Sequence, residues 1–420
     1  MRNKAKFLAL LLITLIITGC RSETIAETPI PPLETILASP IVKQNINSIE
    51  EDAWNAISEF SQNLFLQVLA EDEENPIISP LSAYFALAMV AMGADDNTLE
   101  EFINVLGRDP NILPQELAAL STYLMDTNES TVLQLAGSVW VNDQFTVIPQ
   151  FNEDMTNFFG AAARSRNFSD HATVDEINMW VYTLTRGLIS EIIDEVSQDT
   201  AMLLINTLYV YSQWAEFFSP MNETKQNFYP ENGNATEANF LSTPSRSFNV
   251  NLTNNFEAVM LPYNDNQLGF FMLRPTDGTP IRQFATTINI SEIINDLTIR
   301  EQVRVYMPEL DKEFDILMND ALQTMGLESA FTPFIANFPG LVKENDPPLF
   351  ISRVLQRVRI IVDKEGTEAA AVTMVEAMPA SAPAYVVEPI TLTFNTPYIY
   401  VMYDRSTGIP LFMGVVDRTY

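Results

Sequence analysis

The chain has 420 residues, with 54 acidic side chains against 23 basic ones and a net charge of −31. Such a negative charge argues against binding to the phosphate backbone of nucleic acids. One histidine and one cysteine cannot supply the three or four ligands of a zinc site, and any Ser-His-Asp or Cys-His nucleophile would depend on His171 alone. The composition therefore argues against most hydrolases and metalloenzymes, and we expect no metal and no cofactor.

Residues 1–19 have the pattern of a targeting segment. Three basic residues precede an apolar run at 7–17, which is shorter than the roughly 20 residues of a spanning helix. The run ends in Ile17-Thr18-Gly19-Cys20, which resembles the lipobox of bacterial lipoproteins. That resemblance implies cleavage before Cys20 and acylation of this residue, whereas the alternative is an ordinary signal peptide with an incidental cysteine. Cleavage removes three bases and no acid, so the mature charge becomes 20 − 54 = −34.

Residues 20–50 then comprise the lipidated cysteine and a flexible tether. The tether is rich in proline and polar residues without sustained periodicity, which is typical of a disordered spacer. A short helix near 33–42 that packs on the body is the alternative. We expect a protein anchored to the cell envelope through its lipid alone, on the periplasmic or extracellular face.

The body, residues 51–420, begins with helices and ends with strands. Apolar spacing predicts a helix over 53–69, a fully buried helix from Pro80, and a helix capped by Asn97 that stops at Gly107. Further helices are predicted at 113–126, 149–160 and 174–187. Segments rich in Val, Ile, Leu, Tyr and Phe predict strands at 131–142, 200–211, 256–275, 300–308, 350–363 and 390–416. Without regular βαβ alternation, this order favours an α+β fold.

The segment from Asp363 to Pro389 fits neither pattern. It reads DKEGTEAAAVTMVEAMPASAPAYVVEP and lacks turn signals and a convincing amphipathic face, and long segments of this kind are usually functional or disordered. In an extended conformation, one face would carry Thr367, Ala369, Ala371, Thr373 and Val375. The opposite face would carry both acids, Glu368 and Glu376, so the segment could enter a sheet without burying a charge. From these residues alone, a mobile alanine-rich linker remains the alternative.

Eight motifs in order, over roughly residues 52–418, resemble the serpins. They are NPIISPLSAYFALAMVAMGA from Asn75, INMWVYTLTRGLI from Ile177, NTLYVYSQWAEFF from Asn206, MLPY at 260–263, MPEL at 307–310, MGLESAF at 325–331, the segment GTEAAAVT from Gly366, and PLFMGVV at 410–416. The resemblance implies a serpin fold, with a large central β-sheet, two smaller sheets, about eight or nine helices and an exposed reactive-centre loop at about 364–388.

The resemblance also implies a mechanism. Serpins are typically single-use inhibitors: a protease cuts the loop, and the freed loop inserts into the large sheet while the acyl-enzyme is trapped. The implied hinge comprises Gly366, Thr367, Glu368, Ala369, Ala370, Ala371, Val372 and Thr373. The usual loop length places the cleaved bond at Ala380–Ser381, with Pro379, Met378 and Ala377 as subsite residues before it. An alanine there favours elastase- or subtilisin-like serine proteases, and a shift in register would make Met378 the cleaved residue.

Two departures from the family pattern stand beside the hinge. The implied shutter beneath the opening sheet comprises Ser79, Ser82, Asn206 and Gln356, where inhibitors usually have histidine in place of the glutamine. The implied breach at the top of the sheet includes Trp214, Glu309 and Lys364, the last two with their usual charges exchanged. We therefore predict that Glu309 and Lys364 face each other.

Two classes of function follow. A monomeric, non-enzymatic inhibitor of serine proteases is favoured, with cysteine proteases as a second class of partner. A non-inhibitory serpin-fold binding lipoprotein is the alternative, and Gln356 is its main support.

Overall fold

The computed structural model describes residues 45–71, 73–126, 129–215, 218, 224–367 and 388–419. Within them the chain has the α+β fold that the sequence predicted. The α-helices of the described residues are α1 (Glu51–Ala70), α2 (Pro80–Ala91), α3 (Asp96–Leu106), α4 (Leu113–Met125), α5 (Pro149–Phe159), α6 (His171–Leu184), α7 (Ile281–Ala285), α8 (Ile290–Asn295) and α9 (Asn319–Thr324). The first strands are β1 (Ile77–Ile78), β2 (Thr131–Asn142), β3 (Ala163–Arg166), β4 (Met202–Gln213), β5 (Thr224–Phe228), β6 (Thr236–Ser242), β7 (Arg246–Leu252) and β8 (Phe256–Pro262). The remaining strands are β9 (Leu268–Pro275), β10 (Thr298–Pro308), β11 (Leu310–Leu317), β12 (Arg353–Val362), β13 (Gly366–Thr367), β14 (Ile390–Thr393), β15 (Tyr398–Asp404) and β16 (Pro410–Val416).

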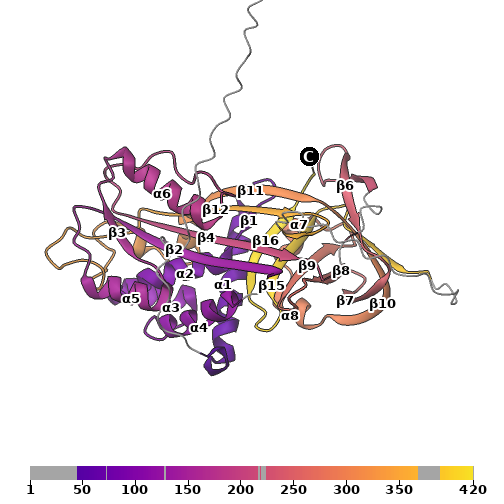
Figure 1. Ribbon diagram of the computed structural model, residues 1–420, viewed down its shortest axis with the longest axis horizontal. Coiled ribbons are helices and arrows are strands. Elements are labelled where there is room, and N and C mark those ends of the chain that lie inside the picture. Colours follow the sequence, from indigo (N-terminus) through magenta and orange to yellow (C-terminus); the bar gives the residue numbers. More distant parts are fainter. Residues whose placement is uncertain are drawn as a thin grey trace, which may run out of the picture.

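A six-stranded sheet in the order β11-β12-β13-β4-β2-β3 runs along the long axis of the molecule (Figure 1). Its longest ladder joins β2 and β4 antiparallel, from Thr131 opposite Ser212 to Val141 opposite Met202. One face packs on α2, every residue of which is buried, and on α4, whereas α6 covers the other face. Helix α2 can lie inside the core because its sequence is apolar nearly all round.

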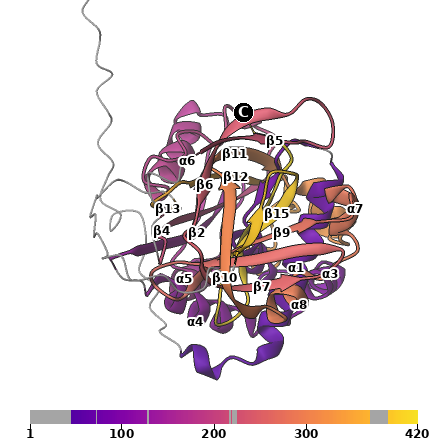
Figure 2. The ribbon, with the colours of Figure 1, turned by 90° about the vertical axis from the view of Figure 1, so that its right-hand side faces the viewer.

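A second sheet, of ten strands, follows the order β1-β16-β15-β9-β8-β7-β10-β6-β5, with β14 alongside β10 (Figure 2). The two smaller sheets expected from the sequence are continuous here, because β10 pairs with β7 over one half and with β6 over the other. Strand β14, directly after the loop segment, lies parallel to β10 from Ile390 opposite Val303.

Some sequence predictions need correction. Asn97 is not the helix cap. The cap is Asp95, two residues earlier, whose side chain accepts a hydrogen bond from the Asp96 amide, whereas the Asn97 side chain donates to Glu101 and Ser329. The segment 256–275 is a hairpin of β8 and β9, and 390–416 contains three strands. Strands β5, β6, β7 and β11 were not predicted, because polar side chains interrupt the apolar pattern in each of them.

The N-terminal end of the described residues lies against the body. Residues 45–50, which the sequence assigned to the tether, include the short 3-10 helix η2 (Ile46–Ser48), which contacts α4. Cys20 and the proposed helix near 33–42 lie outside the described residues. Among the helices that the structure describes, none combines the length and apolarity needed to cross a lipid bilayer.

Candidate functional site

The six-stranded sheet is split between β12 and β4. The two strands pair directly, in parallel, only from Arg353 opposite Leu203 to Gln356 opposite Asn206. At the other end β13 lies between them, with Thr367 opposite both Val362 and Ser212. Within the described residues, no ladder joins 357–361 of β12 to 207–211 of β4. The sheet therefore has a gap between β12 and β4. Direct pairing of the two strands closes it at the Gln356–Asn206 end, here called the lower end, and β13 already enters it at the Thr367 end, the upper end.

The side chains beneath the gap are apolar. Val358 and Ile360 of β12 are buried, as are Leu208 and Val210 of β4, and alternation along each strand places them on the core face. A strand entering this gap would therefore find an apolar floor, which accepts small or apolar side chains and disfavours charges.

A tight turn delivers the chain into the split. The carboxylate of Asp363 accepts hydrogen bonds from the amides of Glu365 and Gly366, at 2.8 and 3.2 Å, and the Asp363 amide donates to the Gly366 carbonyl. Gly366 passes so close to β4 that an added Cβ would lie 2.1 Å from the Ser212 carbonyl oxygen. Only glycine fits this position without a shift of backbone, which explains the hinge glycine by local geometry.

Aromatic side chains hold the upper end of the split. Trp214 stacks on Tyr263, with ring centroids 4.5 Å apart and an interplanar angle of 8°. The Trp214 indole donates to the Asp363 carbonyl at 2.8 Å, and its amide donates to the Glu365 carbonyl at 3.1 Å. Thr367 is buried, with 2% of its surface exposed, and its hydroxyl forms a hydrogen bond with the Tyr263 hydroxyl. Burial raises the pKa of Tyr263, so this phenol stays neutral.

The other two residues assigned to the breach lie near this turn. The Lys364 carbonyl accepts from the Phe218 amide, so β4 and the segment after it hold the turn by its backbone. Glu309 follows β10, and its carboxylate accepts a hydrogen bond of 3.3 Å from the Asn239 side chain. The pairing of Glu309 with Lys364 stays a prediction.

The lower end of the split is a buried polar network. Gln356 donates through its amide nitrogen to the Asn206 side-chain oxygen at 2.7 Å, to the Ser82 hydroxyl at 2.8 Å and to the Ser79 carbonyl at 2.9 Å. Its own oxygen accepts from the Ser79 amide at 2.8 Å. The structure thus brings all four predicted shutter residues together, and glutamine serves both as donor and as acceptor.

This network is incompletely satisfied. The hydroxyl of Ser79, the Asn206 amide nitrogen and the hydroxyl of the neighbouring Thr207 are buried without a partner among the described residues. A buried polar group without a hydrogen bond costs roughly 1–3 kcal/mol. The lower closure of the split therefore carries unpaired polar groups at the point where further widening of the sheet would begin.

Several predicted site residues lie outside the described residues. They are the hinge positions 368–373, the subsite residues 377–379, and the proposed cleavage positions Ala380 and Ser381. Sequence reasoning gave no role to Tyr263 or to the Asp363 side chain, although Asp three residues before Gly is a turn signal that could have indicated the latter. His171 is exposed and begins α6, after the capping Asp170. The described residues contain no group of acidic, histidine or cysteine side chains placed to hold a metal ion.

Comparison with known proteins agrees with this geometry. The family model described as Serpin (serine protease inhibitor) matches residues 55–418. A serpin-like protein of Methanosarcina acetivorans is 27% identical over 400 residues, covering 90% of this chain and 93% of its own. The thermophilic serpin tengpin in its native state superposes with a TM-score of 0.82 at 29% identity, covering 92% of this chain and 98% of that one. For the latent state of tengpin the TM-score is 0.75 at 26% identity, with 90% and 100% covered.

Proposed function

The chain belongs to the serpin family, whose members are generally suicide-substrate inhibitors of serine proteases, and we propose that it is such an inhibitor. In this proposal, a protease attacks the Ala380–Ser381 bond and forms an acyl-enzyme at Ala380. The segment before the cut then enters the split between β12 and β4, carrying the acylated protease with it.

The observation that carries the proposal is the position of β13. Gly366 and Thr367 already occupy the first two places of a strand between β12 and β4, antiparallel to β4. Continuing this register would place Ala369 and Ala371 over the apolar floor and direct Glu368 to the outer face. The sequence after the hinge glycine therefore suits the space that the sheet leaves beside it.

In this register, a single residue of the inserted strand would lie opposite the shutter residues of both flanking strands. Six places beyond Thr367, position 373 would fall opposite Asn206 on β4 and opposite Gln356 on β12, the pair that closes the split in this structure. Complete insertion therefore requires Gln356 and Asn206 to separate, and it would bring the Thr373 hydroxyl near the unpaired Asn206 amide nitrogen.

The small side chain of Ala380 suits a shallow primary pocket, as in elastase- or subtilisin-like proteases, and leaves the acidic pocket of a trypsin-like protease unpaired. Incubation with pancreatic elastase, with subtilisin and with trypsin tests this specificity. We expect an SDS-stable complex with elastase or subtilisin, and N-terminal sequencing of the released peptide should begin at Ser381. A stable complex with trypsin alone would contradict the assignment of Ala380.

The alternative is a non-inhibitory binding protein, and Gln356 at the shutter is its main support. Thermal unfolding distinguishes the two functions. Nicking the loop with a protease should raise the melting temperature strongly, because the inserted strand gains hydrogen bonds on both sides. A nicked protein that melts at the temperature of the intact one would instead support a binding protein that uses the same fold.

We also propose that acylation of Cys20 anchors the protein to the cell envelope, on the periplasmic or extracellular face. The inhibitor would then be a monomer held at the membrane by a flexible tether. The lipobox-like residues 17–20 support this. Mass spectrometry of the mature N-terminus tests it: we expect a lipidated Cys20, and the variant Cys20→Ser should partition into the aqueous phase of a detergent extraction. An unmodified Cys20 in the membrane fraction would contradict the anchor.

A further inference from the structure

The outer face of the split sheet is bridged by the segment that follows α6. Ile189 and Ile193 of this segment lie in one apolar cluster with Ile205 of β4 and Leu355 of β12. The same cluster contains Trp140 of β2, so the segment 185–193 shares one apolar cluster with strands from both sides of the split. It therefore lies across the sheet close to the line along which β12 and β4 would part.

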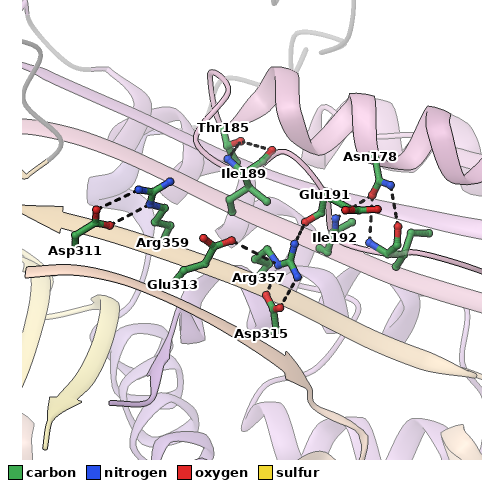
Figure 3. Close-up of polar contacts among 11 residues, drawn as sticks. Asn178, Thr185, Ile189, Glu191, Ile192, Asp311, Glu313, Asp315, Arg357 and Arg359 are labelled. Carbon is green, nitrogen blue, oxygen red and sulfur yellow. Dashed lines mark hydrogen bonds and ion pairs between the residues drawn. The ribbon is translucent and has the colours of Figure 1, made fainter. Parts of the chain in front are cut away.

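On the α6 side this segment is firmly attached. The Asn178 side chain donates to the Ile193 carbonyl at 2.8 Å and accepts from the amides of Ile192 and Ile193. The Thr185 hydroxyl accepts from the Ile189 amide at 3.0 Å (Figure 3). Helix α6 is in turn joined to β3 by a two-bond ion pair between Glu176 and Arg166. This half of the segment should therefore move together with α6 and β3.

On the β12 side, the guanidinium group of Arg357 attaches the segment to the sheet. Arg357 donates through one terminal nitrogen to the Glu191 carbonyl, and through its other two nitrogens to both carboxylate oxygens of Asp315 on β11 (Figure 3). The Glu313 carboxylate lies 3.8 Å from the same group. Asp315 thus fixes the plane of the guanidinium so that its remaining edge faces the segment.

Widening the split strains this bridge. A strand inserted between β12 and β4 adds about 4.8 Å to their separation, and a hydrogen bond does not survive such a displacement. Since several bonds tie the segment to α6, the Arg357–Glu191 bond is the attachment that should yield. Arg357 is also the residue directly after Gln356, whose pairing with Asn206 closes the split.

We propose that Arg357, oriented by Asp315, is a latch that holds segment 185–193 across the split and slows entry of a new strand. This inference rests on the proposed function, because it concerns the step of loop insertion. Arg357 is a positioning residue in this role: it acts through its hydrogen bond to the Glu191 carbonyl of the segment. Removing it should speed insertion, and it should also speed spontaneous insertion of the uncut loop.

The test measures insertion without any protease. The full-length protein in detergent micelles is incubated with a fluorescent peptide of sequence TEAAAVTMVEAM, the segment 367–378, and uptake is followed over time. Arg357→Gln should take up the peptide at least about tenfold faster than wild type, as expected for loss of one charge-assisted hydrogen bond. Arg357→Lys should be intermediate, because an ammonium cannot bind the carboxylate and the carbonyl in the same fork geometry.

Arg359→Gln is the matched control. Arg359 lies on the same face of β12, two residues away, and pairs with Asp311 of β11 as Arg357 pairs with Asp315. An effect on the β11–β12 pairing alone would appear equally in both variants, whereas the latch requires a faster rate for Arg357→Gln. Equal uptake rates for the two variants would overturn the proposal.

A double-mutant cycle tests the part assigned to Asp315. If it acts through Arg357, Asp315→Asn should accelerate uptake, and adding it to Arg357→Gln should change nothing further. Multiplicative effects of the two substitutions would contradict this coupling. Failure of the proposed function gives a different result, since wild-type protein would then take up no peptide at all.

Discussion

The Thr367 hydroxyl is hydrogen-bonded to the hydroxyl of Tyr263, whose ring stacks on Trp214. The first residue after the hinge glycine is thus docked in a buried aromatic site before any protease acts. In the proposed mechanism, insertion would therefore start from a docked end, because Gly366 and Thr367 already hold the register that the rest of the strand would follow.

We expect Thr367→Arg to convert the inhibitor into a substrate. An arginine at this buried position would replace the hydroxyl that pairs with Tyr263 by a charged group, and the cost of burying that charge would oppose docking of β13. Slower insertion gives the protease time to complete hydrolysis. The measurement is the stoichiometry of inhibition with elastase, which should rise well above that of wild type.

Glu368→Arg is the control for that substitution. By alternation its side chain would face solvent in the inserted strand, so a charge is tolerated there. Complex formation at wild-type stoichiometry is expected for Glu368→Arg. The same result for Thr367→Arg would show that burial at this position is irrelevant to inhibition.

Gly366→Ala should weaken the docked turn without altering the cleavage site. Its Cβ would overlap the Ser212 carbonyl and approach the Gln213 Cα at 2.9 Å, both of them backbone atoms. Overpacking of this kind typically costs about 1–3 kcal/mol. Denaturant unfolding should show this loss, whereas Glu365→Ala, in the same turn, should lie close to wild type. Equal stability of the two variants would mean that the hinge glycine is not required sterically.

The sequence predicted best those elements that are mostly apolar and mostly buried. Strand β2 was placed at its observed limits, and α2 was recognised as a buried helix, because burial on both sides leaves little choice of residue. Strand β11 was missed because Asp311, Glu313 and Asp315 interrupt its apolar pattern. Asp311 and Asp315 form ion pairs with Arg359 and Arg357 of β12, and these pairings depend on tertiary structure.

The candidate site was predictable to a similar degree. Motif resemblance grouped Ser79, Ser82, Asn206 and Gln356, but no pattern in the sequence could reveal that Gln356 binds the backbone of Ser79 through both ends of its amide. The docking of Thr367 on Tyr263 was likewise hidden, since 104 residues separate them. Both contacts arise from the way the two sheets meet.

Because glutamine does not titrate, the contribution of the shutter to the stability of the fold should not depend on pH. In Gln356→His, burial disfavours the charged imidazole and lowers its pKa below the unfolded value of about 6.5. The unfolded chain then binds the extra proton, so the stability of this variant relative to wild type should fall as the pH drops below about 6.5. Urea unfolding at several pH values measures the difference, and a constant difference between the two proteins would contradict it.

Charge reversal tests the predicted pairing of Glu309 with Lys364. Glu309→Lys and Lys364→Glu should each destabilise the native state slightly, by up to about 1 kcal/mol for partly exposed groups. The double variant should recover most of the loss, because the pair is restored with its charges exchanged. Additive losses in the double variant would show that the two side chains do not interact.

The ion pair that joins α6 to β3 should contribute a stability that depends on acid pH. Arg166 lowers the pKa of Glu176 through hydrogen bonds to its carboxylate. A carboxylate with a lowered native pKa stabilises the fold above its unfolded pKa, and this contribution is lost as the pH falls through the native value. Glu176→Gln should therefore be less stable than wild type at neutral pH and approach it below about pH 4. Unfolding curves from pH 7 to pH 3 provide the test, with Glu153→Gln, on α5, as a control for general acid effects. A wild-type advantage that persists undiminished at pH 3 would show that the carboxylate charge does not stabilise this contact.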